Sequence, residues 1–143
     1  MEATQRAILD AARARVTAAL PGALDRSELP EGAPLARLPA FAIRAERVAT
    51  TRRSMGSADF EATDRLSVSA WLGGRAGDPT RLEARISAAS SALVQAIMAA
   101  PTDLGGLAFD LRPGSTDSAI EAGEIRVGRC DLEFEVVYIT TGA

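Results

Sequence analysis

The sequence predicts an α+β fold: a two-layer sandwich in which two helices cover one face of a four-stranded, mostly antiparallel sheet, in the order α-β-β-α-β-β. Two segments repeat apolar residues at three- and four-residue steps, the spacing of one helix face, and four segments alternate apolar and polar residues as strands do. Polar, turn-forming stretches join consecutive strands, so neighbours are expected to pair as antiparallel hairpins. Two helices with one apolar stripe each can cover only one sheet face.

The 143 residues fit a single domain, residues 1–143, and a chain of this length can bury a substantial core. Hydrophobic residues make up 47% of the chain but aromatic residues only 4%, because alanine dominates the apolar count. We therefore expect small side chains to pack closely, with backbone near backbone.

The first helix is predicted at residues 3–20. Ile8, Ala12 and Val16 lie on one helix face there, and the pattern stops at Pro21. Residues 23–39 are rich in proline, which disfavours both a helix and a central strand. This stretch is expected to be an extended connector on the surface.

The first strand is predicted at residues 38–48, with apolar residues on one side and Arg44 and Glu46 on the other. Residues 49–62 are polar and irregular, which favours a long hairpin loop. In the next strand, residues 65–72, Trp71 lies on the side opposite the apolar set. A tryptophan at such a position is expected to be covered.

The second helix is predicted from Pro79 to about Ala100, with Asp78 as its N-cap. A short strand at 107–111 and a polar stretch at 112–124 follow. The last strand, 125–141, shows the clearest alternation. Its glutamates, Glu133 and Glu135, are expected to be solvated or paired with arginines of a neighbouring strand.

The composition excludes most enzyme chemistry. The chain has no histidine, lysine or asparagine, and Cys130 is its only cysteine, which we expect to be buried. A P-loop needs lysine, and zincin or deaminase sites need histidine. We therefore predict that the protein is not an enzyme and that it has no catalytic residue and no cofactor.

Two weaker candidates for chemistry have simpler explanations. Ser115 follows a glycine in a turn, but without histidine it has no triad base. Asp117, Glu121 and Glu124 would share one face if their segment were helical, yet Gly123 breaks a helix and three carboxylates fall short of the six to eight oxygens that calcium takes. No metal site is predicted.

The charge and hydropathy patterns exclude two further classes of protein. The net charge of −3 argues against a nucleic-acid-binding domain, which is usually basic. No apolar run approaches the roughly 18 residues that cross a membrane, and the N-terminus has no secretory signal pattern. We expect no membrane association and a soluble protein made in a reducing compartment.

The loop from Thr50 to Phe60 is the best candidate for a contact surface. Arg52 and Arg53, followed by Met55 and Phe60, combine guanidinium groups with adaptable apolar side chains, a mixture that interfaces favour. The alternative is a solvated hairpin tip.

Three stretches resemble the tail terminator proteins of long-tailed phages, the minor tail protein U group. They are Leu38–Ile43, Leu66–Trp71 and Asp131–Thr140. The opening helix, the long hairpin loop and the closing strand also occur in the matching order. The resemblance extends over nearly the whole chain.

The resemblance implies a structural virion protein, located in the tail or neck and assembled in the bacterial host cytoplasm. Such a protein forms a six-membered ring, a hexamer, on the tail tube protein and stops tube polymerisation. The other face of the ring binds the head–tail connector or stopper protein. DNA would pass through the lumen without specific binding. In such a ring, Arg47, Arg52 and Arg53 would meet acidic residues of the next subunit. The expected oligomer or partner contacts are Arg47, Arg52, Arg53, Met55, Phe60 and Trp71.

Two alternatives remain. One is another neck or head-completion protein of the same virion, which would share the ring but bind a different partner. The other is a small-ligand-binding α+β module with a pocket between the face of Trp71 and the helices.

Overall fold

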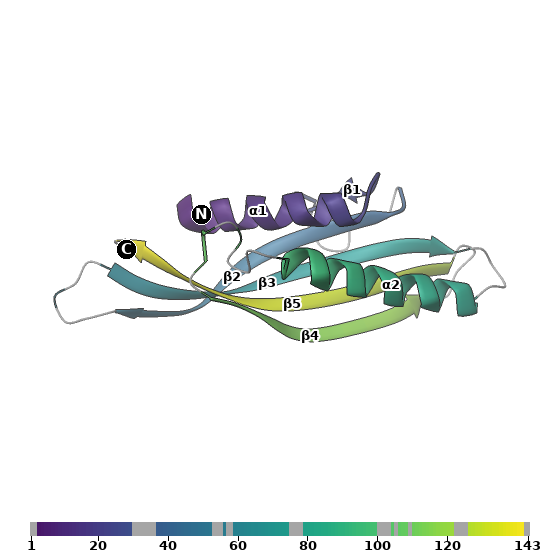
Figure 1. Ribbon diagram of the computed structural model, residues 1–143. Coiled ribbons are helices and arrows are strands. Elements are labelled where there is room, and N and C mark those ends of the chain that lie inside the picture. Colours follow the sequence, from purple (N-terminus) through teal and green to yellow (C-terminus); the bar gives the residue numbers. More distant parts are fainter. Residues whose placement is uncertain are drawn as a thin grey trace.

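The computed structural model contains two helices and five strands (Figure 1). In chain order they are α1 (Ala3–Ala19), β1 (Leu24–Asp25), β2 (Ala40–Arg52), β3 (Asp59–Gly74), α2 (Pro79–Ile97), β4 (Asp110–Glu121) and β5 (Arg126–Thr141). The structure describes residues 3–29, 37–52, 56, 59–74, 79–99, 104, 106–108, 110–121 and 126–141.

The five strands form one mixed sheet in the order β1-β2-β3-β5-β4. β1 runs parallel to β2, and the other neighbours are antiparallel. The prediction of a four-stranded sheet in the order α-β-β-α-β-β is therefore wrong, although the fold is α+β. The extra strand, β1, falls within the predicted connector at 23–39, and two residues are too few to show any alternation.

Backbone hydrogen bonds hold β1 against the start of β2. The amide of Leu24 donates to the carbonyl of Pro39 at 3.0 Å, and the amide of Arg26 donates to the carbonyl of Phe41 at 2.8 Å. A side chain then extends the contact, because the Ser27 hydroxyl accepts the amide of Ile43 at 2.9 Å. The described residues 24–27 of the connector thus cover the first residues of the β2 edge.

The hairpin predicted at 49–62 is present, but its loop is shorter than expected. β2 continues to Arg52 and β3 begins at Asp59. The last residues of β2 are exposed, so no alternation marks them as a strand. Figure 1 shows that these ends of β2 and β3 project beyond the helices, and we call residues 48–52 and 59–63 the arm.

The fourth strand differs from the prediction as well. β4 spans Asp110–Glu121, so it occupies the stretch that was expected to be an irregular polar segment after a strand at 107–111. Residues 112–119 are exposed, and a register shift between Pro113 and Thr116 accommodates the proline. Because β4 is an edge strand, proline is tolerated and neither face needs to be apolar.

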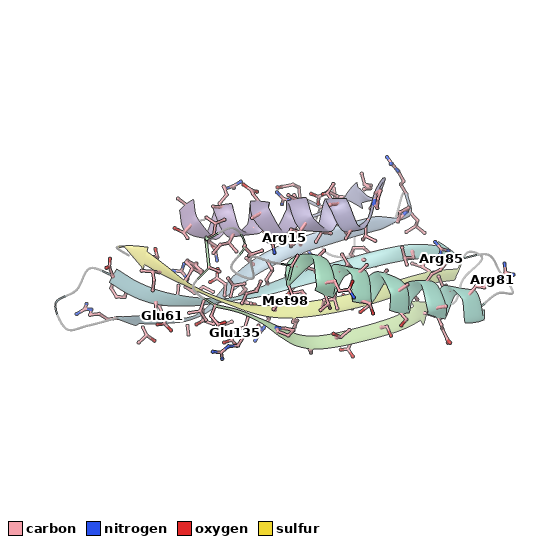
Figure 2. All side chains as sticks on the ribbon, viewed as in Figure 1. Arg15, Glu61, Arg81, Arg85, Met98 and Glu135 are labelled. Carbon is pink, nitrogen blue, oxygen red and sulfur yellow. The ribbon has the colours of Figure 1, made fainter. Side chains whose placement is uncertain are left out.

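Both helices lie on the same face of the sheet (Figure 1), and the core lies between the helices and the sheet. The predicted apolar face of α1 is confirmed, since Ile8, Ala12 and Val16 are buried. Figure 2 shows Arg15 on α1 above the end of α2. Its guanidinium donates to the carbonyl oxygens of Ile97 at 2.7 Å and Ala99 at 3.1 Å, which satisfies carbonyls at the C-terminal end of α2.

Helix α2 approaches the sheet closely at Gly128 of β5. A Cβ atom at this position would overlap the Cδ1 and Cγ1 atoms of Ile86 and lie 3.2 Å from Cδ1 of Leu82. The glycine thus lets α2 pack directly on the strand backbone, as the small-residue composition predicts.

The substitution Gly128→Ala is therefore expected to lower the free energy of unfolding by about 1–3 kcal/mol through overpacking. Shortening the opposing side chain with Ile86→Val should relieve part of this cost. In urea unfolding, the double variant should then lose less stability than the sum of the two single variants. Strict additivity, or no loss in Gly128→Ala, would contradict the packing described.

Candidate interaction surfaces

The face of the sheet opposite the helices is polar and concave, and we call it the open face. It encloses about 610 Å³. Side chains from β2, β3 and β5 cover it, because alternate residues of each strand point away from the helices. These residues are Arg44, Glu46, Arg65, Ser67, Ser69, Trp71, Arg129, Asp131, Glu133 and Glu135.

Trp71 lies on the open face, as predicted, and arginines of its own chain cover it. The guanidinium carbons of Arg26 and Arg129 lie 5.1 Å and 5.2 Å from the centre of the indole ring. Asp131 positions Arg129 by accepting a hydrogen bond from its Nε at 3.0 Å. It also accepts a hydrogen bond from the Ser69 hydroxyl at 2.6 Å. Arg26 is only 7% exposed. Arg26 could not be recognised from the sequence, because it follows a strand of two residues, which is too short to show alternation.

A buried polar network lies at the base of the arm. Asp64, 1% exposed, accepts hydrogen bonds at Oδ2 from Gln5 Nε2 at 2.8 Å and from the Tyr138 hydroxyl at 3.0 Å. Arg47 donates to the Tyr138 hydroxyl at 2.5 Å, and its Nε lies 3.5 Å from Asp64 Oδ1. The network therefore connects α1, β2, β3 and β5 at the point where the sheet leaves the helices.

The network keeps Tyr138 and Arg47 in fixed charge states. Burial raises the pKa of Tyr138 from its ordinary value of 10 to about 12, and the hydrogen bond from Arg47 only partly opposes this. The hydrogen bond to Tyr138 raises the pKa of Arg47, so the guanidinium stays charged. A neutral phenol and a permanent cation cannot shuttle protons near pH 7, so the cluster anchors the arm.

The arm places two of the predicted contact residues together. Arg52 and Phe60 are direct cross-strand partners, and the Arg52 guanidinium lies 5.6 Å from the centre of the Phe60 ring. Arg53 and Met55 lie outside the described residues. Arg47 sits at the base of the arm in the buried network, and Trp71 lies farther along β3 on the open face. The four described residues therefore do not form one cluster.

The remaining candidates for chemistry have structural roles. Burial raises the pKa of the Cys130 thiol, so it stays protonated and unreactive at neutral pH. The Ser115 hydroxyl donates to Glu133 Oε2 at 3.1 Å. Asp117 and Glu121 lie on a strand, while Glu124 is outside the described residues. Within the described part of the chain, no three His, Cys, Asp or Glu residues are grouped to hold a metal ion.

Neither α1 nor α2 is long and apolar enough to cross a membrane. No protein-family model matches the chain, and no curated protein matches it. The open face, the arm and the sheet edges are therefore the features on which a function can be based.

The buried phenol can be titrated directly, because Tyr138 is the only tyrosine. Ultraviolet absorbance of tyrosinate should show a midpoint near pH 12 in the folded protein and near pH 10 in concentrated guanidinium chloride. The folded state keeps its proton where the unfolded state releases it. The free energy of unfolding should therefore be unaffected below pH 10 and should decrease as the pH rises from 10 to 12.

The variant Tyr138→Phe should remove this decrease and should cost about 1–3 kcal/mol at pH 7, because Asp64 loses a buried donor. Glu61→Gln, an exposed change on the same sheet, serves as the control and should leave both quantities unchanged. A midpoint near pH 10 in protein that circular dichroism shows to be folded would contradict the network.

Proposed function

We propose that this protein is a structural virion protein that caps the tail tube of a long-tailed phage or phage-like particle. Copies assemble as a ring of six subunits, stop tube polymerisation and join the tail to the head connector. The three stretches that resemble tail terminators support this, because they lie on β2, β3 and β5. These strands are neighbours in the sheet, so the resemblance maps onto one continuous part of the fold.

The observation that carries the proposal is the projecting arm. Most of its residues lie beyond the helices, so apart from the buried Ala62 the arm adds little to the common core (Figure 1). Residues 59–63 also pair with the end of β5, and the Asp64 network fixes the arm at its base, so it is held in one direction. A rigid extension that carries Arg52 and Phe60 is suited to reach a neighbouring subunit or the tube.

The charge of the open face supports a ring through which DNA passes. On β2, β3 and β5, acidic side chains outnumber arginines at positions that point away from the helices. The acids are Glu46, Asp59, Glu61, Asp131, Glu133 and Glu135, and the arginines are Arg44, Arg65 and Arg129. If this face lines the lumen, its excess negative charge repels the phosphates, so DNA can slide without adhering.

One observation favours a second candidate, a small-ligand-binding module. The sheet lies between Trp71 and the helices, so Trp71 and the helices cannot line one pocket as expected. The open face itself offers a concavity of about 610 Å³ around Trp71, Arg26 and Arg129. A third candidate, an adjacent neck protein, differs from the first only in its partner.

The three candidates can be separated by adding the purified chain to isolated tail tubes and to isolated connectors, with pelleting and negative-stain microscopy as readouts. A ring on one tube end supports termination. A ring bound only to the connector supports the neck protein, and a monomer indifferent to both leaves the ligand-binding module. Solution mass alone decides less, because a tube can template assembly of a monomer.

The arm provides a direct test by mutation. Arg52→Glu combined with Arg53→Glu should abolish ring formation on tubes while leaving the thermal unfolding of the monomer unchanged, since Arg52 is exposed. The matched control is Arg6→Glu with Arg81→Glu, which makes the same change in net charge on exposed helix positions and should leave assembly intact. Unchanged assembly in the arm variant would remove the arm from the proposal.

A further inference from the structure

We propose that copies of this chain join head to tail through their sheet edges, with the first residues of β4 in one copy pairing antiparallel to residues 44–48 of β2 in the next. This rests on the proposed function in that it assumes a ring of copies. It adds the surface by which each copy binds its neighbour.

A row of alternating charges crosses the sheet and supports this pairing. Glu46 of β2 lies opposite Arg65 of β3, which lies opposite Glu135 of β5, which lies opposite Arg112 of β4. Direct cross-strand partners point to the same face, so all four lie on the side away from the helices. Figure 2 shows Glu135 on this side of the sheet. One ion pair of the row is formed, with Arg65 Nη1 3.7 Å from Glu46 Oε2.

The two ends of this row have opposite charges. It begins with a carboxylate, Glu46, on the β2 edge and ends with a guanidinium, Arg112, on the β4 edge. Their side chains are 73% and 67% exposed. Arg112 already donates to Asp110 at 2.7 Å, but a guanidinium has five donors and can bind a second carboxylate. A neighbouring copy placed edge to edge would therefore continue the alternation.

The two ends of the row also disfavour a symmetric contact. Pairing Glu46 with Glu46, or Arg112 with Arg112, would bring like charges together, whereas a head-to-tail contact pairs opposite charges.

In the described part of the chain, neither the outer edge of β4 nor the β2 edge beyond Phe41 is paired with another strand. β4 is the last strand of the sheet and pairs only with β5, while β1 pairs only with Ala40 and Phe41 of β2. Long exposed edges are templates for another strand. β2 and β4 run in opposite directions, so a copy related by rotation about an axis along the strands brings them together antiparallel.

A groove beside β4 leaves room for the segment that covers the start of the neighbour's β2. It encloses about 500 Å³ between α2 and β4, and its lining includes Ser87, Ser91, Thr116 and Ile120. With Glu46 opposite Arg112, Thr116 and Ile120 lie near the level of the neighbour's Ala40 and Phe41, which pair with β1. The neighbour's β1 can therefore lie beside this groove.

The test exchanges the two charges at the ends of the row. Glu46→Arg alone and Arg112→Glu alone each place like charges across every interface. Each should reduce the number of ring-capped tube ends by at least about tenfold. The double variant Glu46→Arg with Arg112→Glu restores opposite charges and should recover ring formation. Glu28→Arg and Arg6→Glu are controls with the same charge changes elsewhere, and thermal unfolding checks that each variant folds.

Cysteines at the same two positions test the geometry without tubes. Glu46→Cys with Arg112→Cys should give a ladder of disulfide-linked oligomers on a non-reducing gel, because each copy offers both halves of the contact. Each single variant should give no ladder beyond trace dimer. Strong dimers from either single variant would indicate a symmetric contact and overturn the inference.

The outcomes separate this inference from the proposed function. Wild-type rings on tube ends that both single charge variants still form would overturn the edge contact and leave termination intact. Charge-dependent ladders and recovery in a chain that never caps tubes would support the contact and overturn termination. A wild-type chain that stays monomeric with and without tubes would overturn both.

Discussion

The buried carboxylate of Asp64 is the constraint on which the rest of the structure depends. A charge removed from water is tolerated only when paired and hydrogen-bonded, and here Gln5, Tyr138 and Arg47 provide the partners. Removing one partner of such a buried pair typically costs about 3–5 kcal/mol. Because the partners come from α1, β5 and β2, the network fixes where the helix layer ends and the arm begins. The direction of the arm, and with it the position of Arg52 and Phe60, follows from this contact.

The two faces of the sheet differ in what they contribute: the helix-side face forms the core, and the open face carries polar side chains. The helix-side face packs small residues so tightly that α2 touches the backbone at Gly128, which makes the body rigid. The open face carries the charged rows and the covered Trp71, and it contributes little apolar burial. Substitutions on the open face can therefore leave the fold intact. The proposed ring requires this separation, because its contacts would then be independent of the folding of each subunit.

Periodicity in the sequence predicted the parts of the fold that bury one face. The apolar stripe of α1 and the alternation in β3 and β5 were correct, and so was the side of the sheet on which Trp71 lies. β1 was missed, and β4 was placed too early at 107–111, for physical reasons. β1 is two residues long, and residues 112–119 of β4 are exposed, so neither imposes a pattern on its residues. The mixed sheet and its fifth strand could not be predicted without them.

The buried network could have been found from the sequence. Asp64 has the same parity along β3 as Ala62, Leu66 and Val68, so alternation places its carboxylate toward the helices. A lone acid in a core row calls for a partner. The identity of the partners was not readable, since Gln5 and Tyr138 lie 59 and 74 residues away along the chain.

Electron cryomicroscopy of tail tubes incubated with the purified chain tests the central claim most directly. The account expects a rotationally symmetric ring on one tube end, with the arm of each copy against its neighbour and no further growth of that end. Tubes whose ends carry no added density and continue to elongate at saturating protein would contradict it.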